Sequence, residues 1–171
     1  MTLALHPPLP PMETRSVEEI PVGPQWQYEP KWDGFRCLVF RDGAKVELQS
    51  KAGQPLTRYF PEIVEAVRAL KAKSFVLDGE LAVPQGKTFS FDALLQRIHP
   101  AASRVNKLSV ETPALLIAFD LLAGTDGKPL LDRTLDERRP ALEAFAKKYF
   151  AKQGRIRCRP RPPSLPTRAN G

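Results

Sequence analysis

The sequence predicts a single α+β domain in which antiparallel strands are flanked by helices. One observation is length, because 171 residues with 42% hydrophobic content are enough to bury one core of ordinary size. A second is the set of strand-like apolar runs, which fall at residues 35–40, 45–50, 74–84 and 114–122. A third is the helical spacing of apolar residues between or after these runs, at residues 60–71, 91–99 and 136–149.

The chain opens on a proline-rich stretch that we assign to residues 1–25. Proline fixes φ and removes a backbone donor, so repeated prolines disfavour both helices and ladder pairing. We therefore expect an extended lead-in over the surface, with order starting near Trp26. The domain proper is expected to cover residues 26–150.

The first two strands are expected to form a hairpin closed at Arg41-Asp42-Gly43-Ala44. The clearest helix follows at residues 60–71, where Pro61 suits the first turn. Its apolar face is formed by Ile63, Val64, Val67 and Leu70. We interpret that face as core.

The second half of the domain is expected to alternate in the same way. A short helix at residues 91–99 should turn Leu94, Leu95 and Ile98 inward, and a last helix should lie near residues 136–149. Pro140 must lie in the opening turn of that last helix, since proline in a helix interior removes a hydrogen bond.

Composition limits the function classes. The net charge is +7, but the cationic residues Lys152, Arg155, Arg157, Arg159, Arg161 and Arg168 all follow residue 150 without an acid among them. We expect residues 151–171 to form a disordered basic tail that binds phosphates weakly and without sequence preference.

No apolar run is long enough to span a bilayer and no signal peptide is recognisable, so we expect a cytoplasmic monomer with no membrane contact. Cys37 and Cys158 are expected to be free thiols.

The most informative segment is Glu29-Pro30-Lys31-Trp32-Asp33-Gly34-Phe35-Arg36, which runs directly into the first strand. A lysine amine is a strong nucleophile only when its pKa of about 10.4 is lowered by desolvation or by nearby cations. Aromatic neighbours can supply the desolvation, Gly34 permits a positive φ or a close approach of a ligand to the backbone, and Arg36 offers a fork for phosphate or ribose oxygens.

Three later segments carry chemistry of the same kind. Glu80 follows Asp78-Gly79 within a strand, where a carboxylate among apolar neighbours is costly unless it meets a metal, a hydroxyl or a cation. Phe119 precedes Asp120 in another strand, and composition alone assigns it to the core. Lys51 lies in Ser50-Lys51-Ala52-Gly53, where a solvated hairpin residue and a phosphate contact are equally good readings.

In these motifs and in their order, over about residues 28–150, the chain resembles the adenylation (nucleotidyltransferase) domain of the ATP-dependent DNA ligases. That family carries Lys-x-Asp-Gly followed by Arg, then Ser-Arg-x-Gly, Asp-Gly-Glu, and a Phe-Asp-Leu strand before a Leu-x-x-Arg-Arg helix. Lys51 departs from the pattern, because it stands where the family usually has arginine and so loses bidentate geometry. The resemblance implies the ligase adenylation fold, an ATP-grasp-like arrangement of antiparallel sheets flanked by helices.

The resemblance also implies roles for single residues. Lys31 would attack the α-phosphorus of ATP to give a lysyl-AMP, with Mg²⁺ (or Mn²⁺) neutralising the departing pyrophosphate. Glu29 would accept from the adenine amino group, Phe119 would stack on the adenine ring, and Lys51 would contact phosphate. Arg36 and Glu80 would hold ribose or phosphate, Glu80 would also bind the metal, and Asp33 would orient the reacting ends. The implied partner is nicked double-stranded DNA, in DNA repair and recombination and alongside DNA-repair proteins.

Two segments of the family pattern are not found after Phe150, a Glu-Gly-apolar-apolar-Lys strand and a Lys-x-Lys segment. The oligonucleotide-binding domain is not found either. We therefore expect a truncated ligase with an incomplete pocket that seals nicks poorly. Two other functions stay open: an RNA ligase or GTP-using capping-type nucleotidyltransferase, and a catalytically dead module that only holds nucleotide or DNA. A histidine-based triad and a Walker-type phosphate loop have no support in the sequence.

Overall fold

A computed structural model describes residues 3–13, 16–24, 26, 28 and 33–161 of the chain. The strands are β1 (Phe35–Asp42), β2 (Lys45–Ser50), β3 (Ser74–Ala82), β4 (Pro84–Gln85), β5 (Thr88–Phe89), β6 (Leu115–Ala123) and β7 (Ile156–Cys158). The helices are η1 (Thr57–Tyr59), α1 (Pro61–Ala69), α2 (Phe91–Leu95), α3 (Ala102–Glu111) and α4 (Leu135–Tyr149). No helix in the described ranges is long and apolar enough to cross a membrane.

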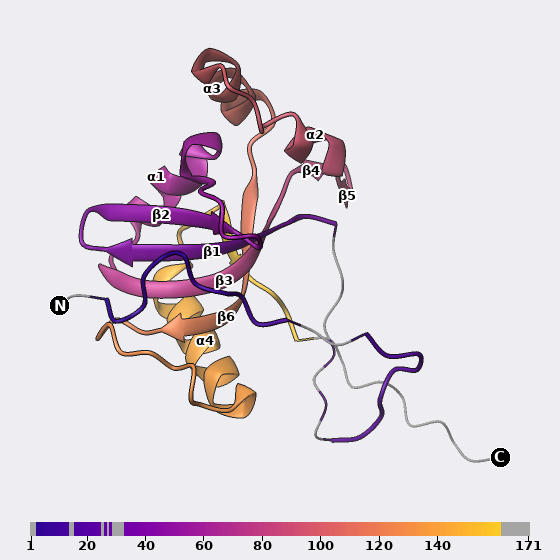
Figure 1. Cartoon of the computed structure of the whole chain (residues 1–171), viewed down its shortest axis with the longest axis vertical. Coiled ribbons are helices and arrows are strands. Elements are labelled where there is room, and N and C mark those ends of the chain that lie inside the picture. The colour runs from indigo at the N-terminus through magenta and orange to yellow at the C-terminus, as the bar shows by residue number, and fades with distance from the viewer. Residues whose placement is uncertain (1–2, 14–15, 25, 27, 29–32, 162–171) are drawn as a thin grey trace.

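Five strands form one twisted sheet in the order β2-β1-β3-β6-β7 (Figure 1). The pairs β1–β2, β1–β3 and β3–β6 are antiparallel, whereas β7 pairs with β6 in parallel after the crossover through α4. The β1–β2 hairpin closes on Gly43, whose φ of 60° is readily available only to glycine. The α+β prediction is confirmed, and the hairpin turn is shorter than expected because β1 continues to Asp42.

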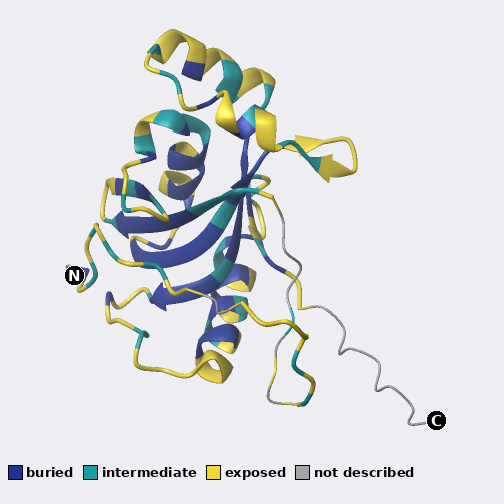
Figure 2. Ribbon diagram, turned by 45° about the vertical axis from the view of Figure 1, so that its right-hand side comes forward, coloured by how far each residue is buried: buried dark blue, intermediate teal, exposed yellow. Residues whose placement is uncertain are grey.

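Helices α1 and α4 cover one face of the sheet, which we call the helix face. The buried side chains on it form one continuous apolar cluster that includes Cys37, Val39, Phe60, Phe75, Leu77 and Leu142. The apolar face predicted for α1 is confirmed, since Ile63, Val64, Val67 and Leu70 are all buried. Figure 2 shows the central strands and the inward sides of both helices as buried.

The opposite face of the sheet is covered by the N-terminal lead-in, and we call it the strap face. Leu3 is only 3% exposed and packs with Leu38, Phe40, Val76, Leu122 and Ala123. Figure 1 shows this segment running in front of the sheet. The expectation that order begins near Trp26 is therefore wrong, because leucines between the prolines give the lead-in an apolar side to bury.

Several elements differ from expectation. Helix α3 was not predicted; it is rich in polar residues and only Val105 of its residues is buried. In α2 and the turn after it, Leu94 is buried but Leu95 and Ile98 are exposed, and Arg97 is buried in their place. Pro140 lies in the second turn of α4, because that helix begins earlier, at Leu135, with a capping box formed by Thr134 and Glu137.

The C-terminal part of the described chain also differs from expectation. Residues 156–158 form β7, and Arg159 directly after it is buried. The disorder expected for residues 151–171 therefore does not extend to these positions. The cause is the parallel pairing with β6, in which Ile156 enters the apolar cluster of the helix face.

Candidate active site

The lysine motif enters the described structure at Asp33, an exposed bend residue. Glu29 and Lys31, which were predicted to hold adenine and to act as the nucleophile, lie outside the described residues. Gly34 lies so close to β3 that a Cβ atom on it would come within 2.4 Å of the Leu81 carbonyl oxygen and 2.6 Å of the Glu80 Cγ. Its φ is not positive, so the glycine serves the close approach of two backbone segments. Gly34 is thereby held directly against Glu80.

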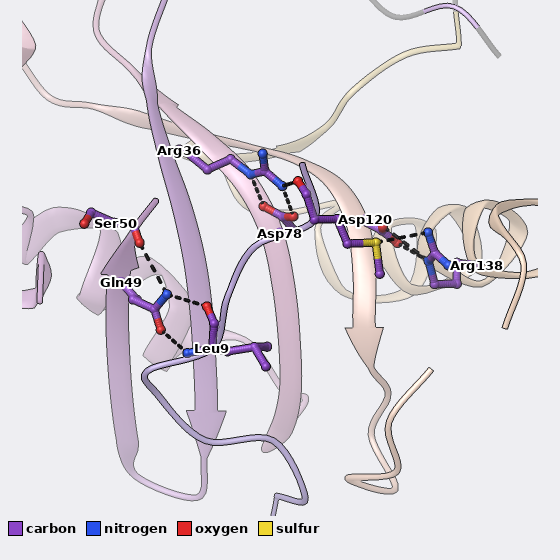
Figure 3. Close-up of polar contacts among 8 residues, drawn as sticks. Leu9, Arg36, Gln49, Ser50, Asp78, Asp120 and Arg138 are labelled. Atoms are coloured by element: carbon purple, nitrogen blue, oxygen red, sulfur yellow. Dashed lines mark hydrogen bonds and ion pairs between the residues drawn. The ribbon is translucent and has the colours of Figure 1, made fainter. Parts of the chain in front are cut away.

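Arg36 follows on β1, and its side chain lies on the strap face. Its Nε and Nη2 donate to the two carboxylate oxygens of Asp78 at 2.6 and 2.5 Å, and Nη2 also donates to the Met12 carbonyl at 2.9 Å (Figure 3). This bidentate geometry fixes the plane of the guanidinium. Burial raises the pKa of the Asp78 carboxyl above its ordinary value, and the hydrogen bond from Arg36 opposes that rise.

Glu80 lies two residues further along β3, on the same face as Asp78. Its Oε2 accepts a hydrogen bond from Nη2 of Arg159 at 3.1 Å. Burial raises the pKa of the Glu80 carboxyl, and the charges of Arg159 and Arg36 oppose this. Glu80 is therefore a partly buried carboxylate whose present counter-ion comes from the segment after β7.

Phe119 lies at an irregularity in the β3–β6 pairing. Asp78 pairs with Asp120 and Gly79 with Ala118, so the register shift leaves Phe119 as an extra residue of β6. Such a bulge turns two consecutive side chains to one face. Phe119 is consequently half-buried on the strap face, whereas its strand neighbours Ala118 and Leu121 belong to the apolar cluster of the helix face.

Two guanidinium groups lie over the Phe119 ring. The Cζ atom of Arg36 is 5.0 Å from the ring centroid and that of Arg159 is 4.5 Å from it. Both distances are within the range of a cation–π interaction. Composition alone assigned Phe119 to the core; the structure instead places its ring beside Arg36, Arg159 and Glu80.

Next to this cluster is a pocket of about 840 Å³, a volume typical of small-molecule sites. Three predicted site residues line it, Arg36, Lys51 and Glu80, whereas Phe119 does not. Lys51 lies in the exposed turn after β2. An apolar wall completes the lining, with Phe35, Leu56, Tyr59, Phe91 and Ile98. The lining of the pocket thus combines two cationic residues and one carboxylate residue with aromatic side chains.

Sequence reasoning missed the residues that hold this arrangement in place. Asp78 was given no role in the site, although its position two residues before Glu80 puts both carboxylates on one face of a strand. Arg138 of α4 pairs with Asp120 through Nε at 3.0 Å, and Arg159 was assigned to a tail. The alternation of β3 could have identified Asp78, but nothing local in the sequence marks Met12 or Arg159.

The described residues contain no group of three or more His, Cys, Asp or Glu side chains that could hold a metal ion. Glu80 is the predicted metal ligand, and the nearby charge of Asp33 also acts on the Glu80 carboxyl. Mg²⁺ is commonly bound by one or two carboxylates together with substrate phosphates. The oxygen donors present fit that mode of binding.

The fold and the pocket define an α+β domain with a charged pocket large enough for a small molecule, and comparison with known proteins gives its family. Residues 11–158 match the family model described as ATP dependent DNA ligase domain. The chain belongs to this family.

Individual relatives agree with the family match. DNA ligase C2 of Mycolicibacterium smegmatis is 51% identical over 143 residues, which cover 84% of this chain and 40% of that protein. DNA ligase C of Mycobacterium tuberculosis is 51% identical over 142 residues, covering 83% and 39%. Among solved structures, a mycobacterial DNA ligase D complexed with ATP and MES superposes with a TM-score of 0.60 at 28% identity, over 80% of this chain and 40% of that one. The chain spans about two fifths of the length of these relatives.

Proposed function

We propose that this chain is the part of an ATP-dependent DNA ligase that forms a covalent lysyl-AMP on Lys31. The observation that carries the proposal is the convergence of Arg36, Lys51 and Glu80 on one pocket, against which Gly34 of the lysine motif is packed. These residues come from three separate segments of the sequence whose motifs follow the family order, with Lys51 standing where the family usually has arginine. Cations for phosphates, a carboxylate for a hydroxyl or metal, and an adjacent lysine are what adenylate transfer requires.

In the proposed reaction the neutral amine of Lys31 attacks the α-phosphorus of ATP. A P–N bond forms, the bond from the α-phosphorus to the bridging oxygen breaks, pyrophosphate leaves, and the proton of the amine passes to solvent. Arg36, held in plane by Asp78, and Lys51 lower the energy of the developing negative charge. Glu29 accepts from the adenine amino group, and Asp33 orients the reacting groups.

Glu80 is the residue proposed to hold Mg²⁺ (or Mn²⁺), which when bound would neutralise charge on the departing pyrophosphate. Arg159 now pairs with this carboxylate and also lies over Phe119. Stacking of adenine on Phe119 therefore requires the Arg159 side chain to move aside. In the longer protein, AMP would pass to the 5′-phosphate of nicked double-stranded DNA, and a 3′-hydroxyl would displace it to seal the nick. We further propose a cytoplasmic monomer acting with other DNA-repair proteins.

The position of Arg159 favours one alternative, a remnant that holds nucleotide or DNA without covalent chemistry. Mass spectrometry of the purified chain after incubation with ATP and Mg²⁺ separates the two. We expect a mass increase of one AMP on the Lys31 peptide and none on Lys31→Ala. ATP binding without any adduct would establish the non-covalent remnant. An adduct from GTP instead of ATP would establish a capping-type nucleotidyltransferase.

A further inference from the structure

A buried side-chain amide fastens the lead-in to the sheet. Gln49 of β2 is only 2% exposed, and its Oε1 accepts from the Leu9 backbone N–H at 2.7 Å. Its Nε2 donates to the Leu9 carbonyl at 2.7 Å (Figure 3). Both backbone groups of Leu9 are therefore satisfied by one side chain, as an adjacent strand would satisfy them. A residue forty positions earlier in the sequence is thereby fixed to the sheet.

The connection from this anchor to the site is short and stiff. Only Pro10 and Pro11 separate Leu9 from Met12, and each proline restricts φ to about −65°. A spacer of this kind has few conformations, so fixing Leu9 restricts where Met12 can lie. We call the anchored segment from Leu9 to Met12 the strap.

Met12 makes two contacts at the end of the strap. Its carbonyl accepts from Arg36 Nη2 at 2.9 Å, and its Sδ accepts from Arg138 Nη2 at 3.5 Å. Met12 therefore contacts both guanidinium groups, whose carboxylate partners Asp78 and Asp120 are opposite each other on β3 and β6. The strap thus contacts Arg36 through Nη2, the nitrogen that also donates to Asp78.

We propose that Gln49 is a positioning residue for the nucleotide site, acting through the strap on Arg36. Arg36 lines the pocket, and its guanidinium is held by the Asp78 carboxylate through Nε and Nη2 and by the Met12 carbonyl through Nη2. Gln49 itself does not line that pocket. The proposal rests on the proposed function only in taking Arg36 to contact bound nucleotide.

A double-mutant cycle on the full chain tests this, with AMP as the probe because it binds without covalent chemistry. We expect Gln49→Leu to weaken AMP binding by about three- to tenfold, the range for mutations that act through a coupled network. In an Arg36→Ala background the same substitution should change AMP binding by less than about twofold, because the path ends at Arg36. Gln153→Leu, the same replacement at a half-buried position remote from the strap, is the matched control and should have no effect.

A second variant covers the case in which Gln49→Leu fails to fold. Replacing both spacer prolines, Pro10→Gly with Pro11→Gly, leaves the Gln49 hydrogen bonds possible but loosens the strap. It should give the same loss of AMP binding and the same dependence on Arg36. Equal losses in the presence and absence of Arg36 would show that Gln49 acts only on the stability of the fold, and would overturn the proposal.

A ligand-free measurement keeps this proposal separate from the proposed function. The Arg36 Nε–H signal in an NMR spectrum, assigned by its disappearance in Arg36→Ala, should shift in Gln49→Leu and in the proline variant. An unchanged signal would overturn the positioning role whether or not nucleotide binds. A shifted signal in a chain that binds neither AMP nor ATP would refute the proposed function, while the link from Gln49 to Arg36 would stand.

Discussion

The two faces of the sheet are made by the same strands but differ in what covers them. The helix face is apolar and packed by α1 and α4, and its cluster runs without interruption from β2 to β7. The strap face is apolar only where the lead-in crosses it, and elsewhere it carries Arg36, Asp78, Glu80, Phe119 and Asp120. Because side chains alternate along a strand, each strand contributes to stability on one side and to chemistry on the other.

Substitutions on the two faces should therefore have separable effects. Changes on the helix face should lower the free energy of unfolding, and changes on the strap face should alter nucleotide binding more than stability.

Phe75→Ala should destabilise the chain by about 3–5 kcal/mol, the usual cost of removing a fully buried phenylalanine. Phe75 is inaccessible to solvent and its ring centroid is 5.1 Å from that of Phe145. Phe119→Ala is the matched change on the strap face. It should cost only about 1–2 kcal/mol, because a half-buried ring loses less apolar area, yet it should weaken AMP binding. Urea unfolding followed by circular dichroism measures the stability of both variants. Equal losses of stability in Phe75→Ala and Phe119→Ala would contradict the separation.

Removing one partner of the buried Arg97–Glu62 pair should cost about 3 kcal/mol, because the other charge stays buried. Arg97 is inaccessible to solvent, and its Nη2 donates to both Glu62 carboxylate oxygens at 2.6 Å. Thermal unfolding should show the loss in Arg97→Met and a partial recovery in Arg97→Met with Glu62→Leu, because the Ala114 N–H also loses its acceptor when Glu62 is replaced. AMP binding should be the same in the double variant as in the wild type. Weaker AMP binding in the double variant would mean that the Arg97–Glu62 pair contributes to nucleotide binding.

Arg159→Ala should tighten AMP binding several-fold, because it removes a cation–π contact worth about 0.5–1 kcal/mol and frees Glu80 from its ion pair. The substitution removes one of the two guanidinium groups over Phe119, while the Arg159 carbonyl can still accept from Arg139 Nη2. The control is Arg161→Ala, whose exposed side chain pairs with Glu143. Titration calorimetry with AMP gives the comparison. Weaker binding in Arg159→Ala would make Arg159 a nucleotide ligand instead of an obstacle.

The smallest effect is a pH dependence that comes from the helix face. Burial strongly raises the pKa of the Cys37 thiol, so the folded chain keeps this proton at pH values where the unfolded chain, with a thiol pKa of about 8.5, releases it. The unfolded state then binds fewer protons, and the free energy of unfolding falls as pH rises above that value. Between pH 8 and 10 Cys37→Ala should show a shallower decline than the wild type in urea unfolding. Identical slopes would contradict the assignment.

Periodic patterns predicted most of the regular structure. The β1–β2 hairpin, α1, β3, β6 and α4 were all expected from their apolar residues and from the turn or capping residues that bound them. Helix α3 is mostly polar and buries only Val105, and β7 forms by pairing with β6, which no local pattern reveals. The packing of the lead-in depends on Gln49, which lies forty residues after Leu9. No local pattern shows this contact, and the prolines of the lead-in by themselves suggested a segment on the surface.

The site was predictable to the extent that it depends on motif order. Arg36, Lys51 and Glu80 were proposed from their motifs and line one pocket, whereas the roles of Glu29 and Lys31 stay predictions. The orientation of Phe119 could not be deduced, because it follows from a register shift between β3 and β6. The contacts of Arg36 with Met12 and of Glu80 with Arg159 join segments with no shared sequence signal.

The burial of Leu3 has a practical consequence for anyone producing this protein. Trimming the proline-rich start, a usual step when crystallisation targets are shortened, would leave Leu38, Phe40 and Val76 open to water and invite precipitation. Expression designs should therefore keep the first dozen residues.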